Sequence, residues 1–228
     1  MKGKLISISG LDGAGKSTQI GVLKNNLIEK GYRCDYFMFD ATHYGSKAME
    51  EVERLRSNDV IFTRLCIDWT ERYPLMKDFV YNPELQIPEI ALAVTAIFAG
   101  GCIQVYESCL KPMIEKGIHI VCDRFWLDDI VYRKFWVDEN IIRLLYKNIP
   151  RPDLPLFLNT SPELVQNRNK SRIDGKSPLM QKVDSINMIR NSFLELSETE
   201  SMTVINGNRP QEAIAKEIFE HVMKVISF

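Results

Sequence analysis

The sequence lacks an excess of charge of either sign. Its 228 residues carry 29 Lys and Arg against 30 Asp and Glu, a formal net charge of −1. Proteins that hold nucleic acid or an anionic membrane surface need concentrated positive charge, so we expect neither as a partner. Internal repeats and low-complexity tracts are also lacking. A chain of this length without them is predicted to form one domain over residues 1–228.

Cysteine and histidine are sparse and show no metal-binding spacing. The five cysteines include no C-x-x-C pair, and the three histidines are scattered along the chain. A structural zinc site of the Cys/His type is therefore not expected. An odd number of cysteines without a pairing pattern favours a reducing compartment, and we predict the cytoplasm.

Long hydrophobic runs free of polar residues are missing as well. The most apolar long stretch, residues 87–105, contains a proline, a glutamate, a threonine and a glutamine. This composition predicts a buried helix of a globular protein, not a membrane span. Residues 1–4 lead directly into an apolar strand, so we expect no signal peptide.

Residues 10–18 read G-L-D-G-A-G-K-S-T, which fits the phosphate-binding loop G-x-x-x-x-G-K-S/T without a mismatch. A largely apolar strand is predicted before it at 4–9, and a helix after it at 19–30. A chance match in a glycine-rich turn is the alternative, but the flanking strand and helix disfavour it. Backbone N–H groups at such a helix start surround phosphate oxygens. The predicted nucleotide-binding residues are Gly10, Gly13, Ala14, Gly15, Lys16, Ser17 and Thr18.

Two of these residues have individual chemistry. Lys16 is expected to contact the β- and γ-phosphates of a nucleoside triphosphate such as ATP, and the Ser17 hydroxyl to hold Mg²⁺. Residues 118–122 are predicted to form the third strand, which is apolar almost throughout and is followed by Asp123 and Arg124. In a protein with a phosphate-binding loop, an acid at this place organises Mg²⁺, and an arginine can clamp a phosphate through two hydrogen bonds. A helix-capping aspartate and a surface arginine are the alternative interpretation.

A basic, glycine-interrupted segment lies at about 168–178. It contains Arg168, Lys170, Arg172 and Lys176 against a single aspartate. We interpret it as a lid that closes over the triphosphate, because cations there would meet the charge that develops on the transferred group. A solvated basic loop is the alternative.

Strand-like and helix-like segments alternate along the whole chain. This alternation predicts an α/β fold, with a five-stranded parallel sheet flanked by helices. The glycine pair at 100–101 leaves two interpretations of the helical region 88–116: one helix with a kink or close contact, or two helices. The strands are predicted at 4–9, 33–39, 118–122, 153–159 and 202–205, and helical stretches include 59–73, 88–116, 179–196 and 210–226.

Together these segments resemble the thymidylate kinase family of P-loop nucleoside monophosphate kinases. The likeness is carried by residues 10–19, by I-V-C-D-R-F at 120–125, by 151–164 and by V-I-N-G at 204–207. The resemblance implies the P-loop kinase fold with strand order 2-3-1-4-5 and a homodimer. It also implies ATP with Mg²⁺ as the phosphate donor and dTMP as the nucleotide acceptor.

The resemblance also implies roles for single residues. Asp12 matches an acid near the acceptor sugar, while Asp123 and Arg124 match the pair that supports Mg²⁺ and the acceptor phosphate. Position 13 is glycine where some members place an arginine. The cation for the transition state is therefore expected from the lid. The implied catalytic set is Lys16, Asp12, Asp123, Arg124, Arg168 and Arg172.

Two family motifs for the acceptor are missing. The loop after the second predicted strand, 40–45, reads D-A-T-H-Y-G and has no arginine, and residues 98–102 lack the arginine of Phe-x-Ala-x-Arg. This leaves two alternatives open. One is a deoxynucleoside kinase-like enzyme with Asp40 as general base, and the other is a nucleotide-binding regulatory protein without acceptor chemistry.

Overall fold

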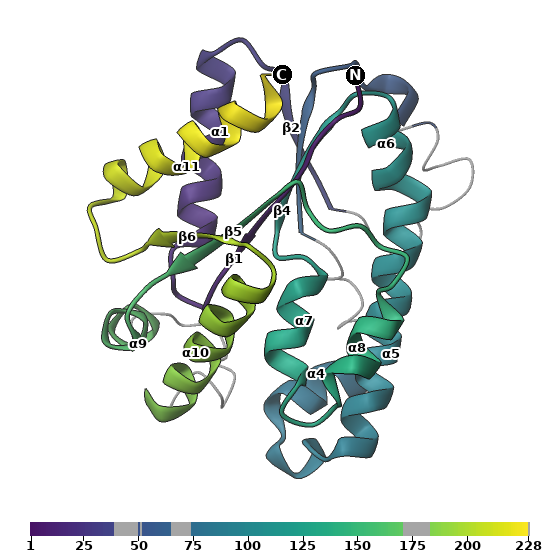
Figure 1. The fold of residues 1–228 in the computed structure, drawn as a ribbon, viewed down its shortest axis with the longest axis vertical. Helices are drawn as coiled ribbons and strands as arrows, with labels where there is room; N and C mark the ends of the chain where they lie inside the picture. The colour runs from purple at the N-terminus through teal and green to yellow at the C-terminus, as the bar shows by residue number, and fades with distance from the viewer. Residues whose placement is uncertain (39–49, 51, 65–73, 171–182, 228) are drawn as a thin grey trace.

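The computed structural model describes residues 1–38, 50, 52–64, 74–170 and 183–227. Its centre is one parallel sheet with helices on both faces, as Figure 1 shows. The α/β class predicted from the alternating segments is therefore confirmed. Both chain termini lie at the same end of the molecule (Figure 1).

The sheet contains six described strands in the order β2-β3-β4-β1-β5-β6, and every neighbouring pair is parallel. All residues of β1, β3 and β4 are buried, which explains why these segments are apolar almost throughout. The strands are β1 (Leu5–Ser9), β2 (Cys34–Phe37), β3 (Val60–Thr63), β4 (His119–Asp123), β5 (Leu154–Asn159) and β6 (Thr203–Asn206).

The prediction of five strands is wrong, because β3 lies inside the stretch 59–73 that was expected to be helical. A run of four apolar or β-branched residues, V-I-F-T, suits a buried strand as well as one side of a helix. In the structure these residues form a strand, because they pair with β2 on one side and with β4 on the other. Without β3, the order equals the 2-3-1-4-5 arrangement that the family resemblance implies. Residues 65–73 lie outside the described part of the chain.

Helices cover the sheet in two groups. Helices α1 and α11 lie side by side, while α5 contacts α4, α7 and α8 (Figure 1). The described helices are α1 (Lys16–Glu29), α4 (Pro74–Tyr81), α5 (Pro88–Val105), α6 (Lys111–Glu115), α7 (Trp126–Arg133), α8 (Glu139–Leu145), α9 (Pro162–Lys170), α10 (Val183–Thr199) and α11 (Gln211–Ile226), with a 3₁₀ turn at Pro83–Leu85.

The helical region 88–116 forms a continuous rod from Pro88 to Glu115, in which a π-helical turn, Tyr106–Leu110, joins α5 to α6. The interpretation of two helices divided at the glycines is wrong, since α5 continues through Gly100 and Gly101. No atom of the described residues outside the helix's own backbone lies within 4 Å of a Cβ built on Gly100. Pro88–Glu115 is the one described helix that is long and apolar enough to span a membrane, and it is partly buried in this fold.

Candidate active site

The loop between β1 and α1 has the backbone geometry of a phosphate cradle. Gly10, Gly13 and Gly15 have φ angles of 148°, 90° and 105°, a region that side-chain-bearing residues rarely occupy. A Cβ on Gly13 would lie 2.5 Å from the Asn169 Oδ1 atom, so a side chain at position 13 would require the Asn169 amide to move. Within the part of the chain that the structure describes, no side chain caps the start of α1. Its first N–H groups are therefore open to an anion.

Lys16 is buried beneath this loop, with 7% of its surface exposed. Its ammonium donates hydrogen bonds to the carbonyl oxygens of Gly10 at 3.0 Å and Leu11 at 2.9 Å. Burial, and next the nearby Arg124, lower the pKa of Lys16 to about 8, although Asp12 and Asp123 oppose the shift. A phosphate at the loop would stabilise the charged form of this lysine.

Arg124 is held between two carboxylates at the end of β4. Its Nη2 atom lies 2.5 Å from Asp12 Oδ1, and its Nη1 atom lies 2.6 Å from Asp128 Oδ1. Its guanidinium also stands 5.2 Å from the centre of the Tyr132 ring. The backbone of Arg124 has φ 69°, a left-handed conformation that costs about 1–2 kcal/mol for a residue with a Cβ. These contacts hold the strained residue in one position.

The sequence interpretation missed Asp128. Its other carboxylate oxygen accepts a hydrogen bond from the Ser9 hydroxyl at 2.5 Å, at the end of β1. Asp128 therefore ties Arg124 to the strand that leads into the phosphate-binding loop. The one signal in the sequence is its place four residues after Arg124, in the first turn of the helix that follows.

Asp123 lies beside the phosphate-binding loop, because it is paired with Ile8 of β1 in the sheet register. The carboxylate is buried, and its Oδ1 atom has no hydrogen-bond partner among the described residues. A buried carboxylate oxygen without a partner is costly unless a cation or donor binds it. Ser17 stands exposed in the first turn of α1. Among the described residues, no three His, Cys, Asp or Glu gather into a metal cluster of their own.

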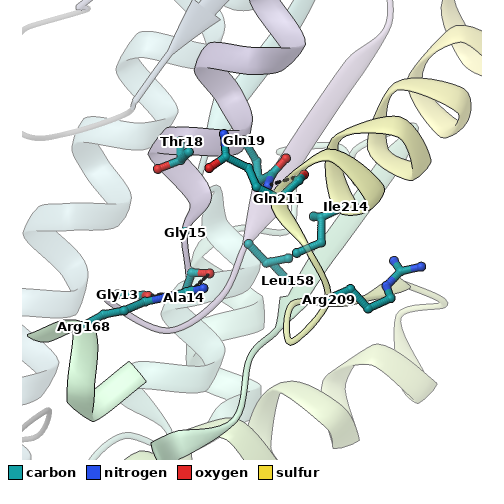
Figure 2. Close-up of a pocket in the computed structure, with 10 residues that line it drawn as sticks. All are labelled: Gly13, Ala14, Gly15, Thr18, Gln19, Leu158, Arg168, Arg209, Gln211 and Ile214. Atoms are coloured by element: carbon teal, nitrogen blue, oxygen red, sulfur yellow. Dashed lines mark hydrogen bonds between the residues drawn. The ribbon is translucent and has the colours of Figure 1, made fainter. Parts of the chain in front are cut away.

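A pocket of about 240 Å³ opens on the β5 side of the loop. Its floor is the loop itself, and Arg168 and Arg209 lie on opposite sides of it, as Figure 2 shows. The Gln19 side-chain amide donates a hydrogen bond to the Gln211 carbonyl at 3.2 Å, which joins α1 to the start of α11. The pocket is lined by Gly13, Ala14, Gly15, Thr18, Gln19, Leu158, Arg168, Arg209, Gln211 and Ile214.

The end of α9 contacts the outside of the loop. Arg168 Nη1 donates to the Ala14 carbonyl at 2.9 Å, and Asn169 Nδ2 donates to the Asp12 carbonyl at 3.0 Å. Arg168 is thus the one predicted lid cation that the described residues place against the loop. Arg172 and the rest of the lid, from 171 to 178, lie outside the described residues. Asn169 was missed, and no pattern in the sequence marks it.

Arg64 was also missed. It follows β3 directly, at the sheet edge where β1 and β4 carry the loop and Asp123. Arg64 was not singled out from the sequence because residues 59–73 were interpreted as a helix, which would not place it at this edge. The loop 40–45 lies outside the described residues, as does Asp40, the alternative general base.

Comparison with known proteins identifies the family. A family model described as thymidylate kinase matches residues 87–218. The chain is 30% identical over 233 residues to the thymidylate kinase of Caldicellulosiruptor saccharolyticus, covering 99% of this chain and 97% of the relative. The chain belongs to the thymidylate kinase family. The chain is also similar to the probable thymidylate kinase of Archaeoglobus fulgidus, at 27% identity over 97% of this chain and 94% of the relative. It is 27% identical to the thymidylate kinase of Francisella tularensis subsp. novicida, over 100% of this chain and 99% of the relative. The resemblance seen in the motifs is confirmed.

Proposed function

We propose that this protein transfers the γ-phosphoryl group of ATP to dTMP, giving ADP and dTDP. The observation that carries this proposal is the pairing of Ile8 with Asp123 in neighbouring strands. It brings the phosphate-binding loop and the Asp123–Arg124 pair together at one edge of the sheet. Edges of this kind, at the carboxyl ends of parallel strands, are where α/β proteins bind ligands. The names of the family and of its relatives supply the acceptor.

The donor triphosphate would lie along the loop, with its base in the pocket toward α11. The N–H groups at the start of α1 and the Lys16 ammonium would hold its phosphates. The pocket continues from Thr18 to Gln211 and Ile214, which leaves space for a nucleoside on that side. Arg168 already touches the loop from the other side, so it would lie close to the phosphates.

Mg²⁺ would be held by Ser17 and Asp123, together with phosphate and water oxygens. The unpartnered buried oxygen of Asp123 fits this role, since Mg²⁺ in phosphoryl-transfer sites takes one or two protein ligands and keeps the rest for phosphate and water. The ion would neutralise charge on the β- and γ-phosphates.

The remaining residues would position the acceptor. Phosphoryl transfer depends mainly on alignment and on charge stabilisation. Arg124, fixed by Asp12 and Asp128, would meet the acceptor beside the loop, with Asp12 near its sugar. Arg168 and Arg172 would supply positive charge to the transferred group.

Direct identification of the product tests this function. Incubation of the protein with ATP, Mg²⁺ and dTMP should give dTDP and ADP in equal amounts by chromatography. Formation of ADP without dTDP would overturn the proposed acceptor.

We further propose a cytoplasmic homodimer that acts on small-molecule nucleotides and binds neither nucleic acid nor membranes. The near-neutral charge and the family support this. Light scattering on the purified protein tests the dimer, which a monomeric mass would exclude.

A further inference from the structure

The inserted strand β3 brings a new residue to the acceptor side of the sheet. Thr63, its last residue, is paired with Cys122 of β4, just before Asp123. Arg64 follows Thr63 and continues in step with Asp123, one strand farther from β1. Arg64 therefore lies at the carboxyl edge of the sheet, close to Asp123 and Arg124 in the sheet register.

The charges at this edge call for another cation. Asp12, Asp123 and Asp128 are three carboxylates, while Lys16 and Arg124 are two cations. Arg124 already has a carboxylate on each side of its guanidinium. A phosphate monoester adds between one and two negative charges near neutral pH. Arg124 alone would have to share its positive charge between that phosphate and the two carboxylates.

The positive charge of Arg64 acts to lower the pKa of two neighbouring acidic groups, Asp12 and Tyr36. Burial raises the pKa of Asp12, but Arg124, Lys16 and also Arg64 lower it, to about 2. At Tyr36 of β2, burial and Asp123 raise the pKa of the phenol while Arg64 opposes the rise. Arg64 is therefore near enough to favour the charged forms of Asp12 and of Tyr36. No ion pair between described residues involves Arg64.

We propose that Arg64 binds the phosphate of the acceptor nucleotide. It would supply, from an inserted strand, the positive charge that positions 40–45 and 98–102 lack. The acceptor of this site is then a nucleoside monophosphate and not a nucleoside. This inference rests on the proposed function and deepens it, because it names the residue that selects the phosphorylated acceptor.

The test compares Arg64→Ala and Arg64→Lys with the wild type. Arg33→Ala is the matched control, since Arg33 is an exposed arginine just before β2 at the opposite edge of the same strands. With ATP saturating, Arg64→Ala should raise the KM for dTMP at least tenfold. The KM for ATP should stay within twofold, and Arg64→Lys should lie between the wild type and Arg64→Ala. Arg33→Ala should match the wild type in both constants.

Equilibrium binding separates a phosphate contact from a structural role. The wild type should bind dTMP more tightly than thymidine, and Arg64→Ala should lose that preference through weaker dTMP binding alone. Thermal melting checks that the variants are folded, and a folded Arg64→Lys keeps the test informative if Arg64→Ala melts early. An unchanged KM for dTMP in Arg64→Ala would overturn the role of Arg64 and leave the proposed function standing. A wild type that makes no dTDP would instead overturn the proposed function.

Discussion

Lys16 shows how a single residue links the loop to its chemistry. Its stem is buried under the loop and its ammonium is held by two loop carbonyls. Removal of this charge should therefore affect phosphate binding far more than folding, because the buried ammonium itself is poorly solvated. We expect Lys16→Ala to lose at least a hundredfold in phosphoryl transfer, with a melting temperature close to that of the wild type. Lys24→Ala, on the same helix α1, is the control and should keep its activity. Equal turnover in Lys16→Ala and the wild type would contradict the role of the loop.

The lowered pKa of Lys16 predicts a pH dependence of ATP binding. Without nucleotide, Lys16 loses its proton at a pH of about 8 instead of 10.5, whereas bound phosphate favours the charged form. ATP binding should therefore take up a proton above pH 8, and the Kd should weaken by up to about tenfold per pH unit there. The unfolded chain keeps this proton up to about pH 10.5, so the same group makes stability rise with pH between about 8 and 10.5. Calorimetry at pH 7, 8 and 9 measures the Kd. Lys16→Arg, which stays charged, should lack the dependence, and a wild-type Kd equal at pH 7 and 9 would exclude it.

Gly13 and Asn169 form a coupled pair. A Cβ at position 13 meets the Asn169 Oδ1 atom at 2.5 Å and requires φ 90°, so Gly13→Ala should cost about 2 kcal/mol in stability. Removal of the amide in Gly13→Ala/Asn169→Ala should recover about 1 kcal/mol as a coupling in urea unfolding. Gly21→Ala is the control, since Gly21 lies in α1 and no described neighbour comes within 4 Å of the added carbon. It should be neutral or stabilising by up to about 1 kcal/mol. Independent, additive effects at positions 13 and 169 would disprove the contact.

At the scale of elements, β3 is the departure from expectation. Its Phe62 is fully buried, while Tyr36, its partner in the register of β2, is 45% exposed. Phe62→Ala should therefore destabilise the fold by about 3–5 kcal/mol, as loss of a buried aromatic side chain does. Tyr36→Ala should cost less than about 1.5 kcal/mol. Urea unfolding of both variants measures this difference, and equal losses would mean that β3 is not part of the core.

The same element shows where sequence interpretation succeeds and fails. The strand before the loop, β1, and the one that ends in Asp123, β4, could be predicted because long apolar runs precede recognisable polar motifs. Strand β3 could not, since four apolar residues suit a helix or a strand until their neighbours in space are known. Of the two interpretations left open for residues 88–116, division into two helices at the glycines is wrong for a related reason. Packing against α4, α7 and α8 outweighs about 1 kcal/mol of unfavourable helix propensity per glycine.

The candidate site divides in the same way. Gly13, Lys16 and Arg124 lie in motifs whose local order alone predicts their place. Asp128 and Asn169 contact the strand before the loop and the loop itself from distant parts of the chain, through Ser9 and through the Asp12 carbonyl. Residues that position others in this way carry no motif, because their spacing from the loop in sequence is arbitrary.

At the scale of the molecule, the loop after β1 has one side toward β5 and another toward β4, at the carboxyl edge of the sheet. Under the proposed function, the pocket toward β5 and α11 would take the donor, and the side toward β4 and β3 would take the acceptor. Because β1 lies between β4 and β5, the loop that follows it would hold the phosphoryl group during transfer from donor to acceptor. The inserted strand widens the acceptor side by one strand, about 4.8 Å.

The central claim is that a nucleoside monophosphate, dTMP, receives the phosphoryl group. Its most direct measurement is ADP release with ATP and Mg²⁺ across a panel of nucleoside monophosphates and free nucleosides. The account predicts release with dTMP, and none above background with thymidine or deoxycytidine. Release with nucleosides alone, or with no acceptor in the panel, would contradict it.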